Sequence, residues 1–121
     1  MSKPYVWLAC DTPDNARLDF SSLRGYGEIA PVFKGLWPAA EPDRALDIAR
    51  QWADREYDAT LDYVCSSPLC DPLAIALMLI ALRERHAGDE VRWMRWDRRT
   101  DKDGSRTRHG YYTPVAFNVG G

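Results

Sequence analysis

The longest apolar stretch of the chain lies near its centre, between two shorter runs with the composition of β-strands. Every residue from Leu73 to Leu82 is apolar, so a helix formed there has no polar face. Asp71 can accept hydrogen bonds from the first amides of such a helix, and Pro72 is favourable at its first position. Gly88 can adopt the positive φ that often follows a helix. The pattern predicts a buried helix that begins at Pro72.

This apolar helix is too short to cross a membrane. Ten residues of α-helix span about 15 Å, whereas the hydrocarbon core of a bilayer is about 30 Å thick. The charged residues Arg83, Glu84 and Arg85 follow it directly. We therefore expect a helix of a soluble protein, with no membrane partner.

Two apolar runs flank the helix and are typical of strands. Leu61–Cys65 is rich in β-branched and aromatic residues, and Glu90–Trp96 follows the helix. A strand, a helix and a strand in this order form a crossover unit, in which the two strands are parallel and the connection is right-handed. This unit predicts an α/β fold.

The remaining chain extends the same pattern. Pro31 indicates that its strand lies at a sheet edge, and Asp103-Gly104 predicts a hairpin turn before the last strand. The predicted elements are a central strand Pro4–Cys10, a helix Thr12–Leu23, a strand Glu28–Phe33, a helix Pro42–Tyr57 and a final strand Tyr111–Val119. They predict a three-layer Rossmann-like sandwich with a mostly parallel five-stranded sheet and an antiparallel C-terminal edge strand. We expect one domain over residues 1–121, with a basic hairpin at 97–110 and a flexible tail at 120–121.

Composition narrows the function classes without choosing one. The chain has 121 residues and a formal net charge of −2, so charge alone does not favour nucleic acid or an acidic membrane. Its N-terminus does not resemble an export signal, and three cysteines are an odd number. We expect thiols in a reducing compartment and therefore a cytoplasmic protein.

Polar and thiol groups follow the predicted parallel strands, where open α/β sheets usually bind ligands. The candidate ligand-binding residues at this carboxyl edge are Cys10, Asp11, Lys34, Ser66, Ser67 and Asp71. Three cysteines at one edge could hold zinc, but Cys65 and Cys70 do not have the usual ligand spacing. A catalytic cysteine needs a nearby base, and none is evident. We predict no metal site, no catalytic residues and no cofactor.

A phosphate site at the same edge is an alternative. The turn Ser66–Cys70 precedes a helix N-terminus, where amides and the helix dipole favour anions. However, the turn has no glycine and no following lysine, and Asp71 occupies the place of the anion. A nucleotide sensor or small enzyme at this edge therefore remains a secondary hypothesis.

The predicted hairpin is basic and aromatic. From Arg92 to His109 there are seven basic residues and three acidic ones, while Glu41–Asp62 has seven acidic and three basic residues. Arginines interleaved with aromatic residues suit single-stranded nucleic acid, although charges at an edge hairpin also block aggregation between sheets. The candidate residues for binding nucleic acid or a partner are Arg95, Trp96, Arg98, Arg99, Lys102, Arg106 and Arg108.

The second half of the chain resembles small Rossmann-like proteins of phages and mobile elements, most of which are uncharacterised. The residues that carry the resemblance are Asp62-Tyr63-Val64, Ser67-Pro68, Asp71-Pro72-Leu73-Ala74, Val91-Arg92-Trp93 and Trp96-Asp97-Arg98-Arg99. The resemblance implies an accessory protein that binds a host protein, and it implies no catalytic residues.

These observations together favour a non-enzymatic protein that acts by binding another protein. An apolar helix needs more cover than one amphipathic helix and a sheet provide, so we also expect a homodimer. Nucleic-acid binding through the hairpin and a ligand site at the carboxyl edge are the alternatives.

Overall fold

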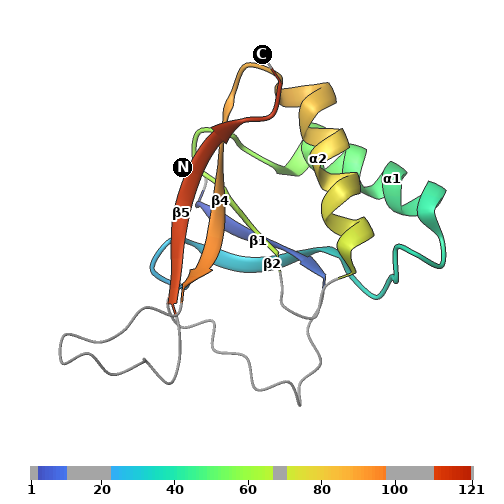
Figure 1. Cartoon of the computed structure of the whole chain (residues 1–121), viewed down its shortest axis with the longest axis horizontal. Helices are drawn as coiled ribbons and strands as arrows, with labels where there is room; N and C mark the ends of the chain where they lie inside the picture. The colour runs from blue at the N-terminus through green and yellow to red at the C-terminus, as the bar shows by residue number, and fades with distance from the viewer. Residues whose placement is uncertain (1–2, 11–22, 67–70, 98–110, 121) are drawn as a thin grey trace.

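The computed structural model describes residues 3–10, 23–66, 71–97 and 111–120, of which 96, 97 and 111 are described only as parts of strands. Its sheet has five strands in the order β2-β1-β3-β4-β5 (Figure 1). The strands are β1 (Tyr5–Cys10), β2 (Glu28–Phe33), β3 (Tyr63–Cys65), β4 (Glu90–Asp97) and β5 (Tyr111–Asn118). The first four are parallel, and β5 pairs antiparallel with β4 along its whole length.

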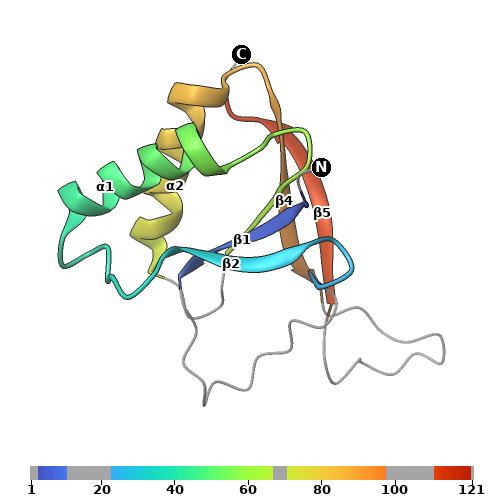
Figure 2. The same ribbon diagram turned by 180° about the vertical axis from the view of Figure 1, so that it is seen from behind.

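The helices lie together on one side of this sheet, which we call the helix-bearing face (Figures 1 and 2). They are α1 (Pro42–Gln51), a π-helical turn η2 (Trp52–Glu56) that continues it, and α2 (Pro72–His86). α1 lies against β2, and α2 lies against β1. Two ion pairs join the helices: Arg50 Nε lies 2.9 Å from Glu84, and Arg85 Nε lies 3.7 Å from Asp54.

The core is divided by the sheet into two clusters. The larger one lies between the sheet and the helices and contains Trp7, Trp52, Leu77, Met78 and Leu82, among others. The smaller one lies on the opposite face and consists of the buried residues Val6, Leu8, Leu23, Cys65, Met94 and Tyr112. Side chains alternate between the two clusters from Val6 to Ala9 of β1, as the pleat of a sheet requires, whereas Cys10 at the strand end joins Ala9 in the larger cluster.

The predicted fold class is confirmed: a mostly parallel five-stranded sheet with an antiparallel C-terminal edge strand packs with helices in an α/β sandwich. β1 is central and β2, with Pro31, is at an edge, as the sequence indicates. The predicted helix Thr12–Leu23, which would supply the third layer, falls almost entirely on residues outside the described ranges. Among the described residues, none of the helices combines the length and apolarity that crossing a membrane requires.

The predicted helix Pro42–Tyr57 changes its hydrogen-bond pattern in its last part. From Trp52 onward the turn is π-helical, and the Tyr57 amide donates to the Trp52 carbonyl oxygen at 2.8 Å. The wider turn buries both aromatic side chains, whose ring centroids lie 5.1 Å apart. π-helical turns are rare and have no simple sequence signature, so the sequence did not predict this one.

The start of β1 passes very close to the start of β2. The Glu28 amide donates to the Pro4 carbonyl oxygen at 3.1 Å, and a Cβ atom added to Gly27 would lie 2.6 Å from that same oxygen. Only glycine fits this position without a shift of the backbone.

We therefore expect Gly27→Ala to lower the free energy of unfolding by about 1–3 kcal/mol, because the new methyl group overlaps backbone atoms. The control is Gly25→Ala, since a Cβ atom there would meet nothing within 4 Å. Urea unfolding should leave the control within about 1 kcal/mol of the wild type. Equal effects of the two substitutions would contradict the close approach.

Candidate functional site

The carboxyl edge of the sheet has the topology of a ligand site. β1 and β3 are neighbours, and the chain leaves β1 toward β2 but leaves β3 toward β4. Ligands of open α/β sheets usually bind at such a point of divergence. Of the predicted edge residues, Cys10, Lys34, Ser66 and Asp71 are described here, whereas Asp11 and Ser67 lie outside the described residues.

The two described cysteines do not form a site together. Cys10 packs in the larger core cluster and Cys65 in the smaller one. Among the described residues there is no group of three side chains suited to holding a metal ion. Cys70 lies outside those residues, and its relation to the other two stays open.

Cys65 has the chemistry of a structural thiol. It is fully buried, donates to the Ser66 carbonyl oxygen at 3.4 Å and hydrogen-bonds with the Tyr112 hydroxyl. Burial raises the pKa of the Cys65 thiol to about 12, and burial also raises the pKa of Tyr112. Because the nucleophilic form of cysteine is the thiolate, this thiol is poorly suited to catalysis.

Both carboxylate oxygens of Asp71 accept hydrogen bonds from the backbone. Oδ1 accepts from the Leu73 amide at 3.0 Å, which makes Asp71 the N-cap of α2 as the sequence predicted. Oδ2 accepts from the Ala39 amide at 3.0 Å and so ties the loop after β2 to the start of α2. This arrangement disfavours an anion at the helix N-terminus.

The other predicted site residues are scattered. Lys34 is exposed in the turn after β2, and Ser66 is half-buried beside α2. In the basic hairpin, Arg95 is exposed on β4, and Trp96 is described only as a strand residue that pairs with Tyr112. The remaining hairpin residues, Arg98, Arg99, Lys102, Arg106 and Arg108, lie outside the described residues, so the nucleic-acid hypothesis stays a prediction.

At the opposite, amino edge of the sheet, Asp62 is the centre of a buried network. Its carboxylate accepts from the Tyr5 amide at 3.0 Å, the Trp7 Nε1 at 2.9 Å and the Asp58 amide at 2.9 Å. The side chain is 2 % exposed, and the Arg92 guanidinium donates to the Asp62 carbonyl oxygen at 3.2 Å. One residue thereby joins the beginning of β1, the loop before β3 and the side of β4.

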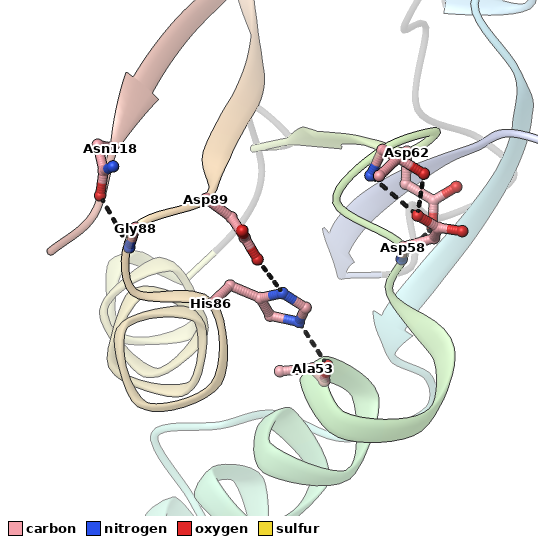
Figure 3. A network of polar contacts seen from close by, with 8 residues as sticks. Ala53, Asp58, Asp62, His86, Gly88, Asp89 and Asn118 are labelled. Carbon is pink, nitrogen blue, oxygen red and sulfur yellow. Dashed lines mark hydrogen bonds and ion pairs between the residues drawn. The ribbon is translucent and has the colours of Figure 1, made fainter. Parts of the chain in front are cut away.

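His86 closes the same edge from the end of α2 (Figure 3). Its Nε2 lies 2.8 Å from the Ala53 carbonyl oxygen, and its Nδ1 lies 3.1 Å from the Asp89 carboxylate. Since a carbonyl oxygen only accepts, Nε2 carries a proton. The imidazole also packs edge-on against the Tyr57 ring, with centroids 5.0 Å apart.

A pocket of about 530 Å³ lies over this network, lined by side chains that include Lys3, Arg55, Asp58, Asp62 and Asp89. Tyr57 also lines it, and burial followed by the nearby Asp62 carboxylate raises the pKa of Tyr57 to about 12. Two of its lining residues are already engaged with backbone atoms, Asp62 with the Asp58 amide and His86 with the Ala53 carbonyl oxygen. The polar residues that line this pocket therefore have a structural role, because they join separate elements of the fold.

A second surface, which we call the α2–β5 groove, is apolar. It consists of two adjoining hollows of about 410 and 300 Å³ between α2 and the last two strands, and both are lined by Leu79 and Phe117. The lining residues are Ser66, Ile75, Leu79, Ile80, Arg83, Trp93, Phe117, Asn118 and Val119. The rings of Trp93 and Phe117 lie 6.3 Å apart on its floor.

Large apolar side chains are exposed along this groove. Ile80 is 43 % exposed, Phe117 38 %, and Val115, which pairs with Trp93 in the register of β4 and β5, 46 %. Ile75 and Leu79 are half-buried on the same side of α2. An apolar surface of this kind on a monomer is typical of a binding site.

The groove has fixed walls. The Gly88 amide donates to the Gly120 carbonyl oxygen at 2.8 Å and to Asn118 Oδ1 at 3.3 Å, which fastens the end of β5 to the end of α2. Gly88 has φ +91°, as the sequence predicted for the residue that ends this helix region. A surface held in this way does not need to be ordered when a ligand binds, and this favours binding.

Comparison with known proteins finds no family model, no curated protein and no solved structure that matches the chain. The resemblance to phage and mobile-element proteins therefore stays a prediction. The candidate site depends on the geometry of this chain.

The sequence did not reveal the Asp62 network or the α2–β5 groove. It placed Asp62 inside the third strand, whereas the structure starts β3 at Tyr63 and buries Asp62 just before it. It expected α2 to need additional cover, but it did not connect Ile75, Leu79 and Ile80 with Val115 and Phe117. That connection depends on the pairing of β4 with β5 and could not be read from periodicity alone.

We expect Asp62→Ala to lower the free energy of unfolding by at least about 3 kcal/mol, because three donors lose their buried acceptor. Asp47→Ala, an exposed aspartate on α1, is the matched control and should change it by about 0.5 kcal/mol or less. Urea unfolding followed by tryptophan fluorescence measures both. An Asp62→Ala protein as stable as the control would show that the network does not hold the amino edge.

We expect Cys65 to resist alkylation by iodoacetamide in the folded protein at pH 8. A pKa of about 12 leaves roughly one molecule in ten thousand as thiolate at that pH, and burial excludes the reagent. Mass spectrometry of the peptide that contains Cys65 should show labelling only in about 8 M urea. Rapid labelling of Cys65 in the native state would show that its thiol is reactive, and Cys65 would then be a candidate catalytic group.

Proposed function

We propose that the protein acts by binding another protein, and that the α2–β5 groove is the binding surface. The observation that carries this proposal is the exposure of apolar side chains from α2 and β5, above all Ile80 and Phe117 in the groove and Val115 on the same face of β5. Such side chains lose contact with water when a partner covers them, which favours the complex by about 25 cal/mol per Å² of apolar surface before the entropic costs of association are subtracted.

The chemistry elsewhere supports a binding role. At the carboxyl edge the described groups are a capping aspartate and cysteines in separate core clusters, and at the amino edge the buried carboxylate is bonded to three donors. The expected cytoplasmic location and a host protein as partner belong to the same proposal.

Binding through the groove is testable without knowing the natural partner. A displayed library of random 16-residue peptides is selected on the wild-type protein and counter-selected on the double variant Ile80→Ser/Phe117→Thr. The variant removes apolar anchors and adds no charge, and serine and threonine suit an exposed helix and strand, respectively. It should retain the wild-type circular dichroism spectrum and a stability within about 1 kcal/mol.

We expect enriched peptides to bind the wild type with Kd values of roughly 1–100 μM and to bind the double variant at least about tenfold more weakly. The matched control is Trp37→Ser, because Trp37 is 56 % exposed but does not line the groove. Fluorescence anisotropy measures all three affinities. Peptides that bind the double variant as well as the wild type, or no enrichment at all, would contradict the proposal.

A further inference from the structure

The helix layer of this protein stops before the sheet does. α1 lies against β2 and α2 against β1, so the two helices cover the half of the sheet that contains these strands. Val91 of β4 is still fully buried beneath α2, whereas Val115 and Phe117 of β5 are exposed on the same face. Within the described part of the chain, therefore, no helix covers β5 on the helix-bearing face of the sheet.

The space beside α2 has about the width that one further helix would need. Neighbouring helices pack at 8–10 Å, which is about the width of two strands at 4.8 Å spacing. One further helix beside α2 would lie over β4 and β5, with Leu79 and Ile80 as its lateral contact and Trp93 and Phe117 beneath it. The groove extends at least from Ile75 to Arg83, about 12 Å of helix, which corresponds to about nine residues of an occupant helix.

An added β-strand fits this surface less well. The remaining edge of the sheet on this side is β5, and Pro114 within it has no backbone N–H. Proline in an edge strand usually turns its missing donor outward and so interrupts further pairing. The exposed apolar side chains also project from the face of β5, where a strand paired at its edge would not cover them.

Charge limits the chemistry of the occupant. Arg83 lines the groove at one end, and Arg95 lies two residues beyond Trp93 on the same face of β4, toward the other end. Both are exposed, and neither has an ion-pair partner among the described residues, in contrast to Arg50, which pairs with Glu84 of α2, and Arg85, which pairs with Asp54 of η2. The groove itself is lined by no acidic residue of the described chain.

We propose that the occupant of the α2–β5 groove is an amphipathic helix of a partner protein, with apolar residues at i, i+3, i+4 and i+7 and acidic residues at both ends. This inference rests on the proposed protein-binding function and makes it specific. The helix completes the layer beside α2, and its acidic ends pair with Arg83 and Arg95. A second copy of this chain is disfavoured, because two-fold packing of the groove brings the arginines of both copies together.

The test uses three synthetic 14-residue peptides with labelled N-termini and the full-length protein. The first has the apolar spacing of the proposed helix and two glutamates at each end. The second has lysines in place of the glutamates, and the third has the glutamates but a central proline that prevents the helix. Fluorescence anisotropy is measured with the wild type, with Arg83→Glu/Arg95→Glu and with Arg24→Glu/Arg44→Glu, a control of equal charge change at exposed arginines outside the groove.

We expect the glutamate peptide to bind the wild type roughly tenfold more tightly than the lysine peptide, and the proline peptide to bind at least tenfold more weakly than the glutamate peptide. For Arg83→Glu/Arg95→Glu the lysine peptide should bind more tightly than the glutamate peptide, whereas the control variant should keep the wild-type order of affinities. In about 0.5 M salt, the difference in affinity between the two peptides should become smaller.

Other outcomes overturn the inference and separate it from the proposed function. Equal binding of the glutamate and lysine peptides, or tighter binding of the proline peptide, would refute an acidic helix. Library peptides with alternating apolar residues would also refute it, while leaving binding at the groove intact. Sedimentation equilibrium that shows a wild-type dimer and a monomeric Ile80→Ser/Phe117→Thr protein would make a second copy the occupant. Failure of the library selection itself would refute both.

Discussion

α2 is apolar on every side for ten residues, and this constraint governs the arrangement of the rest of the molecule. Its buried side consists of Ala74, Leu77, Met78, Ala81 and Leu82, whose larger side chains each stabilise the fold by about 1.5–3 kcal/mol when fully buried. The sheet and α1 cover that side. The side toward β5 keeps Ile75, Leu79 and Ile80 at the surface, so the feature that makes the core also makes the candidate binding surface.

The amino edge of the sheet is held by a different kind of interaction. Asp62 gathers donors from β1 and from the loop before β3, and His86 fastens the end of α2 to η2. Charged and polar groups in such positions are expensive to bury without partners, and here the partners are supplied by several elements at once. The result is that the end of α2 is held to η2, and the start of β1 to the loop before β3.

The fold could be predicted from the sequence to the extent that local patterns determine it. The apolar run with Asp71 and Pro72 at its start predicted α2 and its N-cap, and the alternation of strand and helix patterns predicted the parallel sheet. The site depends on relations between distant residues. Cys10 and Cys65 both end predicted strands, yet they pack in different core clusters. Likewise, Phe117 meets Leu79 only because β5 pairs with β4 in one particular register.

The proposed binding surface requires that one side of α2 and β5 is exposed in the protein alone. Relaxation of side-chain methyl signals by a soluble paramagnetic agent, measured by NMR at low protein concentration, tests this directly. The account predicts strong relaxation of the Ile80 and Val115 methyl groups and strong protection of those of Leu82, which is fully buried. Protection of Ile80 and Val115 equal to that of Leu82 would show that the groove is already covered, and would contradict its role as a binding surface.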